Sequence, residues 1–308
     1  MGIREGLKPK AQSREPTKDQ RPKTSDWRGQ GSGMKTVAAI KAVGVIGAGR
    51  MGQPIIGHMA RKGLAVAAYD IDPARQGVVA KLGATWADSL TSLARASEAV
   101  LVCVGYDREL RALMSPDGLL GDLQRGTIVA VLSTVHPRTV QELAESARPF
   151  GVHLVDSTVA RGGRAADAGT LLAFIGGDPD VMERLRPVFA CFSADIVHTG
   201  EVGTAQVAKA ANNLVMWACV VANHEALALA RRFGVDVGRL REALLMSSAD
   251  NYALRHWGEN TMAWADDDME IIQAMAHEVG IGLPQAGLNR ELCRTLKPKR
   301  FRLEDYGV

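Results

Sequence analysis

Short apolar runs alternate with longer amphipathic stretches from residue 37 to about residue 200. β-branched and small apolar residues predict strands at Ala42–Ile46, Ala65–Asp70, Val100–Val104, Thr127–Leu132, His153–Asp156, Leu171–Ile175 and Asp195–His198. Helical patterns lie between most of these runs. Such alternation is typical of a parallel sheet with right-handed crossovers. We therefore expect an α/β fold with a doubly wound parallel sheet in this part of the chain.

The pattern changes after Gly203. Residues Thr204 to Phe233 form one Ala/Val/Leu-rich stretch without Pro or Gly, and Gly234 follows where a helix would end. Further helices are predicted around Asp236–Ser247 and Asp267–Val279, with no strand among them. We expect one domain over residues 37–199 and an all-α C-terminal domain over residues 200–308. No uninterrupted apolar run approaches 18 residues, so no membrane span is expected.

Positive charge is concentrated at the N-terminus. Residues 1–35 hold nine Lys or Arg and four acids, a net +5, so the remainder carries −2 of the total of +3. A near-neutral body argues against nucleic-acid binding, which needs a basic face on the domain itself. The polar composition predicts that residues 1–36 form a disordered basic tail. Its acids, and the lack of an amphipathic stripe, argue against a mitochondrial presequence.

The four cysteines are widely spaced. Cys103, Cys191, Cys219 and Cys293 form no C-x-x-C pair, which argues against a zinc site or a disulfide framework. The N-terminus also lacks the apolar core of a signal peptide. We expect a cytoplasmic protein without a metal ion.

The strongest local motif is G-x-G-x-x-G, placed between the first predicted strand and a helix. Its first glycine permits a tight turn, its second lets the backbone approach a pyrophosphate, and its third allows close helix–strand packing. The amides at the helix N-terminus favour an anion. The motif predicts a Rossmann-type dinucleotide site whose cofactor-binding residues include Gly47, Ala48, Gly49, Arg50, Met51 and Gly52.

An acid follows the second predicted strand. Asp70 lies 23 residues after Gly47, where a carboxylate can accept hydrogen bonds from both adenosine ribose hydroxyls. The same carboxylate would repel a 2′-phosphate, and the next residue is Ile71 rather than an arginine. NAD is therefore expected as the cofactor in preference to NADP.

These residues resemble the β-hydroxyacid dehydrogenase family, which includes 3-hydroxyisobutyrate dehydrogenase and tartronate semialdehyde reductase. The family start G-x-I-G-x-G-x-M-G is present as Gly44–Gly52, and its S-T-x-x-P element as Ser133–Pro137. The resemblance implies that Thr134 lies beside the nicotinamide end of the cofactor. It also implies that Val104 and Gly105 stand where relatives place a Leu-Pro pair next to the nicotinamide ribose.

The substrate loop of the family, D-A-P-V-S-G-G, is matched with two departures. Residues Asp156–Gly162 align without a gap, but Ala160 replaces the serine that would contact a substrate carboxylate, and Arg161 replaces a glycine. Arg161 is a candidate to bind that carboxylate as a bidentate partner, and Gly162 is expected in the same loop. A solvent-facing arginine is the alternative interpretation.

The most specific element is Gly200–Gly203 followed by Lys209-Ala-Ala-Asn212-Asn213. It is similar to the G-x-G-x-x-x-K-x-x-N-N segment of the family, which implies that Lys209 is the general acid/base and that Asn213 holds the substrate. Asn212 is a further substrate-binding candidate. Lys209 and Asn213 share one helix face, and desolvation among apolar neighbours would lower the pKa of the lysine. The competing interpretation is a surface lysine with ordinary polar helix contacts.

One further departure concerns a later helix. Relatives often carry K-D-L there, with the lysine near the cofactor, whereas this chain has Asp267-Asp268-Met269. An acid cannot make that cationic contact, so Asp267 is not a predicted site residue. The acids at 266–268 are expected to begin a helix, where they suit the dipole.

We expect an oxidoreductase that transfers a hydride reversibly between NAD and a small 3-hydroxy acid, such as 3-hydroxyisobutyrate, or its semialdehyde. Two alternatives stay open: an imine reductase-like enzyme, although such enzymes usually lack the lysine, and a non-catalytic reader with the same fold. The resemblance also implies a homodimer or homotetramer. Neither a membrane nor a nucleic acid is expected as a partner.

Overall fold

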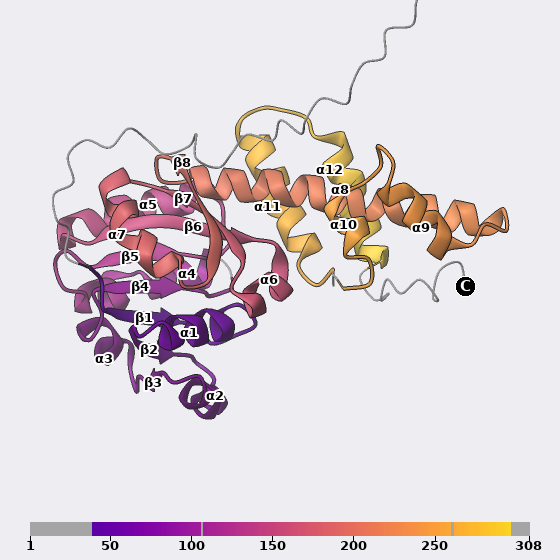
Figure 1. The fold of residues 1–308 in the computed structure, drawn as a ribbon. Coiled ribbons are helices and arrows are strands. Elements are labelled where there is room, and N and C mark those ends of the chain that lie inside the picture. Colours follow the sequence, from indigo (N-terminus) through magenta and orange to yellow (C-terminus); the bar gives the residue numbers. More distant parts are fainter. Residues whose placement is uncertain (1–38, 106, 260–261, 297–308) are drawn as a thin grey trace, which may run out of the picture. The chain divides into compact units, whose positions relative to one another are not determined.

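The computed structural model describes residues 39–105, 107–259 and 262–296. An eight-stranded sheet with the order β3-β2-β1-β4-β5-β6-β7-β8 forms its first part (Figure 1). The strands are β1 (Ala42–Ile46), β2 (Ala65–Tyr69), β3 (Thr85–Trp86), β4 (Ala99–Val102), β5 (Ile128–Val131), β6 (His153–Ala160), β7 (Leu171–Gly176) and β8 (Ser193–Gly200). This confirms the doubly wound α/β sheet expected from the sequence.

The direction of the last two strands differs from the expectation. Strands β1 to β6 are mutually parallel, but β7 pairs antiparallel with β6, and β8 pairs parallel with β7. The segment between β6 and β7 spans only residues 161–170. A parallel crossover needs about a dozen residues or more, so this short connection can only return the chain beside β6 in the opposite direction.

Helices follow most strands and then continue without strands in the described C-terminal part. They are α1 (Gly52–Arg61), α2 (Gln76–Lys81), α3 (Leu90–Arg95), α4 (Asp107–Leu113), α5 (Pro137–Ala147), α6 (Gly162–Ala168), α7 (Pro179–Phe189), α8 (Thr204–Arg232), α9 (Val237–Leu245), α10 (Tyr252–Arg255), α11 (Ala265–Glu278) and α12 (Pro284–Leu296), with short helical turns at Pro73–Arg75, Pro116–Leu120 and Arg148–Phe150.

The sheet buries both of its faces. Successive side chains of a strand point to opposite sides, so the apolar runs split between two clusters. In β4, for example, Ala99 and Leu101 enter one cluster with Val43 of β1, while Val100 and Val102 enter the other. Strands buried on both faces are expected to read as continuous apolar runs, as these do.

Helix α8 organises the C-terminal part. Its 29 residues supply Trp217, Val220 and Leu227 to a third core cluster, together with Met269 of α11 and Leu254 of α10. Asp236 caps α9 through a hydrogen bond from the Arg239 amide, as its position in the sequence suggests. The helix bundle is therefore built around one long element that begins at the sheet (Figure 1).

By length and composition alone, α8 could also cross a membrane. The most apolar 18-residue window within Thr204–Arg232 has a mean hydropathy of 1.3, and 33% of that window is buried. The apolar residues of this helix do not form one uninterrupted run, because Lys209 and the asparagines lie between them. A core helix passes the same criterion, and α8 contributes core residues.

Sequence patterns missed some short elements. The two-residue strand β3 and the four-residue helix α10 carry too few residues to show a periodicity, and α12 was not predicted either. Strand β6 runs four residues beyond its predicted end, to Ala160. The predicted disordered tail over residues 1–36 lies outside the described residues.

A tight turn at the start of α1 generates a stability prediction. A Cβ on Gly52 would overlap the carbonyl oxygen of Gly47, which is main chain and cannot move aside alone. We expect Gly52→Ala to lower the free energy of unfolding by about 1–3 kcal/mol, the usual cost of overpacking. This loss would be measured as a lower midpoint of urea unfolding.

The matched control is Gly77→Ala in α2. Its Cβ would meet nothing within 4 Å. Replacing a helical glycine by alanine there is expected to stabilise the protein by about 0.4–1 kcal/mol. Equal midpoints for the two variants would contradict the close approach at Gly52.

Candidate active site

The predicted cofactor-binding residues gather at one edge of the sheet. The glycine motif follows β1, Asp70 follows β2, Val104 and Gly105 follow β4, and Thr134 follows β5. The carboxyl ends of parallel strands lie at one edge, and ligands of open α/β sheets bind there, at the point where the strand order reverses. In this sheet that point lies between β1 and β4.

The glycines of the motif differ in how much space surrounds them. Gly47 has φ +99°, and a Cβ there would overlap the carbonyl oxygen of Cys103. Gly49 is different, because a Cβ there would meet nothing within 4 Å. The turn is therefore crowded on the protein side at Gly47 and Gly52 and open at Gly49, where a phosphate group can approach the main chain.

Asp70 is built into this turn. Its Oδ2 accepts a hydrogen bond of 2.7 Å from the Ala48 amide, and its Oδ1 accepts one of 2.9 Å from the Asp72 amide. The carboxylate is thus fixed beside the glycine motif, at the end of β2. The neighbouring Ile71 is 91% exposed, and its side chain carries no charge.

Arg50 and Met51 face different surroundings. The Arg50 guanidinium forms two hydrogen bonds, of 2.8 and 2.7 Å, with the carboxylate of Asp167 in α6. Met51 packs against the core cluster of the sheet. The predicted cofactor contact of Arg50 can therefore come from its main chain while its side chain ties the glycine motif to the segment after β6.

The ends of β4 and β5 are joined by a side chain. Ser133 donates from Oγ to the carbonyl oxygen of Val104 at 2.8 Å. Val104 and Thr134 are both partly exposed and Gly105 is exposed, at the edge where the glycine motif lies. The structure therefore brings together the residues that the resemblance assigns to the nicotinamide side.

Helix α8 begins alongside β6. The carboxylate of Asp156 in β6 accepts hydrogen bonds from the Gly203 amide at 2.8 Å and from the Gln206 amide at 2.9 Å. Two positions further along β6, Thr158 Oγ1 donates to the Ala205 carbonyl oxygen at 2.9 Å. Burial raises the pKa of Asp156 to about 6, although the amide hydrogen bonds oppose this shift. The first turn of α8 is thereby held against the strand that leads into the substrate loop.

Lys209 reaches this same strand. Its Nζ donates to the Val159 carbonyl oxygen at 2.7 Å, within the segment 156–162 that aligns with the substrate loop of the family and that begins inside β6. Burial lowers the pKa of Lys209, and the negative charge of Asp268 works in the opposite direction. A lysine with a lowered pKa exchanges a proton more readily near neutral pH than an ordinary surface lysine.

Asp268 is a site residue that the sequence did not identify. Trp217 donates from Nε1 to its Oδ2 at 2.9 Å, and Asn213 also hydrogen-bonds this carboxylate. Burial raises the pKa of Asp268, against the effects of Lys209, Trp217 and Asn213. The acids at 266–268 do lie in the first turn of α11, as predicted, but Asp268 points to α8. The sequence does show Lys209, Asn213 and Trp217 at spacings of four residues on one face of α8, but it does not indicate which residue meets that face.

The two asparagines form a linked pair. Asn213 is 2% exposed, and its Oδ1 accepts a hydrogen bond of 3.0 Å from Asn212 Nδ2. Asn213 thus lies between Asn212 and Asp268, on the helix face that carries Lys209. Asn213 is therefore held in place by hydrogen bonds to other side chains.

Arg161 has a conformation that favours glycine. Its φ of 81° lies in the left-handed region, so the chain keeps at this position the backbone shape for which relatives use glycine. Its guanidinium contacts Asp195 of β8 at 2.6 Å and the Thr170 carbonyl oxygen at 3.1 Å, and Tyr252 donates to its carbonyl oxygen at 3.0 Å. Gly162 follows as the exposed first residue of α6.

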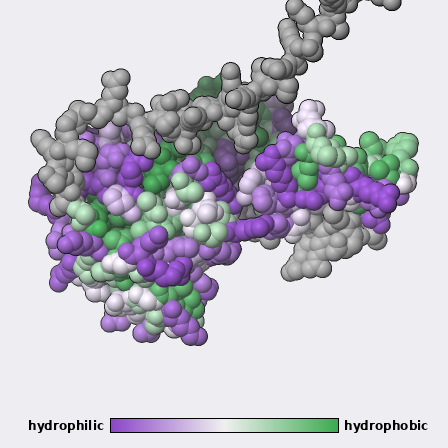
Figure 2. Space-filling model, in the orientation of Figure 1, coloured by the Kyte–Doolittle hydropathy of each residue, from purple (hydrophilic) through white to green (hydrophobic). Residues whose placement is uncertain are grey.

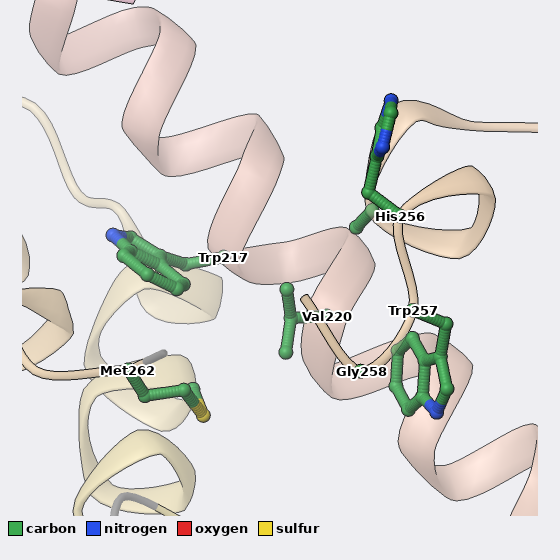
Figure 3. Close-up of a pocket in the computed structure, with 7 residues that line it drawn as sticks. Trp217, Val220, His256, Trp257, Gly258 and Met262 are labelled. Atoms are coloured by element: carbon green, nitrogen blue, oxygen red, sulfur yellow. The ribbon is translucent and has the colours of Figure 1, made fainter. Parts of the chain in front are cut away.

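A small apolar pocket lies elsewhere in the helical part. Figure 3 shows Trp217 and Met262 on one side of it and His256 and Trp257 on the other. Its interior of about 10 Å³ holds one water at most. It contains none of the predicted site residues, and within the described ranges no three His, Cys, Asp or Glu side chains are arranged to bind a metal ion.

Two family profiles match the chain. Residues 42–200 match the NAD-binding domain of 6-phosphogluconate dehydrogenase. Residues 203–306 match the family described as the NAD-binding part of NADP-dependent 3-hydroxyisobutyrate dehydrogenase.

Individual relatives agree. An NAD-dependent L-serine dehydrogenase of Pseudomonas aeruginosa is 29% identical over 87% of this chain and 96% of its own length. A 3-hydroxyisobutyrate dehydrogenase of the same organism is 32% identical over 69% of this chain and 72% of its own. A solved structure of Mycobacterium tuberculosis 3-hydroxyisobutyrate dehydrogenase with L-serine shares the fold, with a TM-score of 0.77 at 21% identity over 85% of this chain and 95% of that one. The resemblance seen in the sequence is thus confirmed: the chain belongs to the β-hydroxyacid dehydrogenase family.

Proposed function

We propose that this protein catalyses reversible hydride transfer between NAD and a small 3-hydroxy acid or its semialdehyde, with Lys209 as the general acid/base. One observation carries the proposal. The Lys209 ammonium is held against β6, in the segment that aligns with the substrate loop, and burial lowers its pKa. A desolvated lysine at that position is suited to exchange a proton with a substrate oxygen.

The names of the relatives support the substrate class. L-Serine and 3-hydroxyisobutyrate both carry a primary alcohol on the carbon next to the one that bears the carboxylate. Both substrates therefore present a hydroxyl group and a carboxylate at the same separation. A small acid with this arrangement is the substrate class that we propose.

The residues at the sheet edge fit a nicotinamide dinucleotide. Gly49 leaves open space at the start of α1, and Asp70 is fixed beside it by the Ala48 amide. When bound, such a cofactor supplies the hydride acceptor or donor of the reaction. The Asp70 carboxylate would accept hydrogen bonds from ribose hydroxyls and repel a 2′-phosphate, which favours NAD over NADP. Val104, Gly105 and Thr134 would line its nicotinamide side.

Lys209 handles the proton that accompanies the hydride. In the oxidation direction, neutral Nζ accepts the proton from the substrate hydroxyl. In the reduction direction, the Nζ ammonium donates a hydrogen bond to the carbonyl oxygen and then protonates it. Asn213 and Asn212 would bind the substrate beside this nitrogen. Asp268 acts on the lysine through its charge and holds Asn213 in place.

We further propose that the chain assembles as a homodimer or homotetramer and is cytoplasmic. Figure 2 shows apolar surface at the end of the helical part where α8 and α9 meet. The exposed apolar side chains there are Leu229, Phe233, Val235 and Met246. A second copy of the helical part would cover such a surface, whereas a monomer would leave it in water.

The activity is tested with NADH and NADPH against a panel of 3-carbon and 4-carbon semialdehydes, followed as loss of cofactor absorbance. Turnover of a semialdehyde, faster with NADH, is the expected result. Reduction of cyclic imines alone would favour an imine reductase. Cofactor binding without any turnover would favour a non-catalytic reader.

Lys209→Met tests the proton transfer. It removes the ammonium but keeps an unbranched apolar side chain below it, so we expect kcat to fall by about 10²–10⁴-fold while NADH still binds. Fluorescence titration with NADH provides the binding control. A kcat close to that of the unmodified enzyme would refute the role of Lys209.

Asp268→Asn tests the charge beside Lys209. The carboxylate raises the pKa of Lys209, so its removal lowers that pKa further. Oxidation needs neutral Lys209, so the acidic limb of the kcat/KM profile for the hydroxy acid should move to lower pH. Asp267→Asn, in the same turn of α11, is the control and should leave the limb in place. Movement to higher pH would contradict the arrangement.

Arg161→Ala tests whether its guanidinium binds the substrate carboxylate. Loss of a bidentate partner should raise KM for the acid by about tenfold or more, with a smaller change in kcat. Asp195→Asn serves as the comparison, because it breaks the same ion pair but keeps the arginine. If Arg161 only pairs with Asp195, both variants will lose stability and neither will change KM.

A further inference from the structure

Gln206 is a buried polar residue one turn before Lys209 in α8. It is 1% exposed, and every polar group of its side chain is used. Its Nε2 donates to the Ser133 carbonyl oxygen at 2.9 Å, and its Oε1 accepts from the Val135 amide at 3.0 Å. The carboxamide is therefore hydrogen-bonded to the main chain on both sides of Thr134.

The hydrogen bonds that involve Gln206 continue beyond the loop after β5. Ser133, whose carbonyl oxygen accepts from Gln206, itself donates from Oγ to the Val104 carbonyl oxygen after β4. The main chain of Gln206 is fixed in turn by the carboxylate of Asp156 in β6. Gln206 thus connects the loop after β5, and through Ser133 the end of β4, with the middle of β6 and with the helix that carries Lys209.

The chemistry of the side chain suits this position closely. The Ser133 carbonyl oxygen needs a donor and the Val135 amide needs an acceptor, and both groups are buried. A primary amide offers one of each from a single planar group, whereas a carboxylate lacks the donor and an apolar side chain lacks both. Leaving buried main-chain groups unpaired costs free energy, so residues 133–135 are expected to stay bound to the Gln206 side chain.

The spacing between Gln206 and Lys209 sets the geometry. Residues i and i+3 of a helix lie on one face, so a shift of α8 against the sheet moves Lys209 and the loop around Thr134 together. Reaction rates are sensitive to such distances, since a displacement of about 1 Å can cost about 10²-fold.

We propose that Gln206 is a positioning residue for the reaction, which holds residues 133–135 at a fixed distance from Lys209. The inference rests on the proposed function, because Thr134 and Lys209 are taken to face the two reacting partners. Gln206 touches neither partner in this arrangement. It acts through the loop that it binds.

The test compares Gln206→Met, which loses both hydrogen bonds, with Gln141→Met in α5. The Gln141 Nε2 donates to the Val202 carbonyl oxygen at 3.2 Å, so this control loses a glutamine contact near the start of α8 without touching residues 133–135. Amide hydrogen exchange, NADH affinity and steady-state kinetics are measured on the full chain for each variant.

For Gln206→Met we expect exchange of the Val135 amide to accelerate by about tenfold or more. Exchange of the Leu132 amide, which donates to the Val102 carbonyl oxygen, should stay the same. We expect kcat to fall by about 10–10²-fold with KM for NADH unchanged, and a larger primary deuterium isotope effect. Gln141→Met should match the unmodified protein in all three measurements.

Two results would overturn the inference: an unchanged kcat in Gln206→Met despite faster Val135 exchange, or an equal loss in Gln141→Met. If Gln206→Met does not fold, Gln206→Glu takes its place: it keeps the acceptor for the Val135 amide and loses the donor to Ser133, so Val135 exchange should stay slow while kcat still falls. An unmodified protein that turns over no substrate would instead refute the proposed function, and the Val135 exchange would still report on the loop.

Discussion

The carboxylate of Asp156 accepts the first free amides of α8 and so decides where that helix starts. These amides have no partner within the helix, and α8 has no side-chain cap of its own. Because the cap comes from β6, the helix can begin only beside that strand. The contacts of Gln206 and Lys209 with the sheet then follow from helix geometry. A charge buried in a sheet would be expensive alone, and the amide dipoles of the helix end reduce that cost.

The fold was largely predictable because its signals are local. Apolar runs identified seven of the strands, and the glycine motif identified the dinucleotide edge, since each depends on a few consecutive residues. The reversed direction of β7 and β8 follows from the short connection between β6 and β7, and the apolar pattern does not show how long that connection is. The roles of Asp268 and Gln206 depend on contacts between residues 51 and 71–73 positions apart, which a single sequence cannot display.

Arg161 shows where sequence reasoning gives an incomplete answer. A glycine-to-arginine change in a substrate loop suggests a new cation for an acidic ligand. The structure adds that the left-handed backbone is kept and that Asp195 holds the guanidinium. The backbone shape that relatives obtain from glycine is therefore maintained here by an ion pair and by the Tyr252 hydroxyl.

The length of α8 has a mechanical consequence. At about 1.5 Å per residue, the 20 positions from Lys209 to Leu229 span about 30 Å of continuous helix. The end near Lys209 is anchored to the sheet, and the other end carries exposed apolar side chains. A tilt at one end of a straight helix of this length also moves the other end. A partner that covered the end near Leu229 would therefore also restrain the position of Lys209. If Lys209 transfers the proton as proposed, surface substitutions around Leu229 would therefore affect that step although they lie far from the lysine.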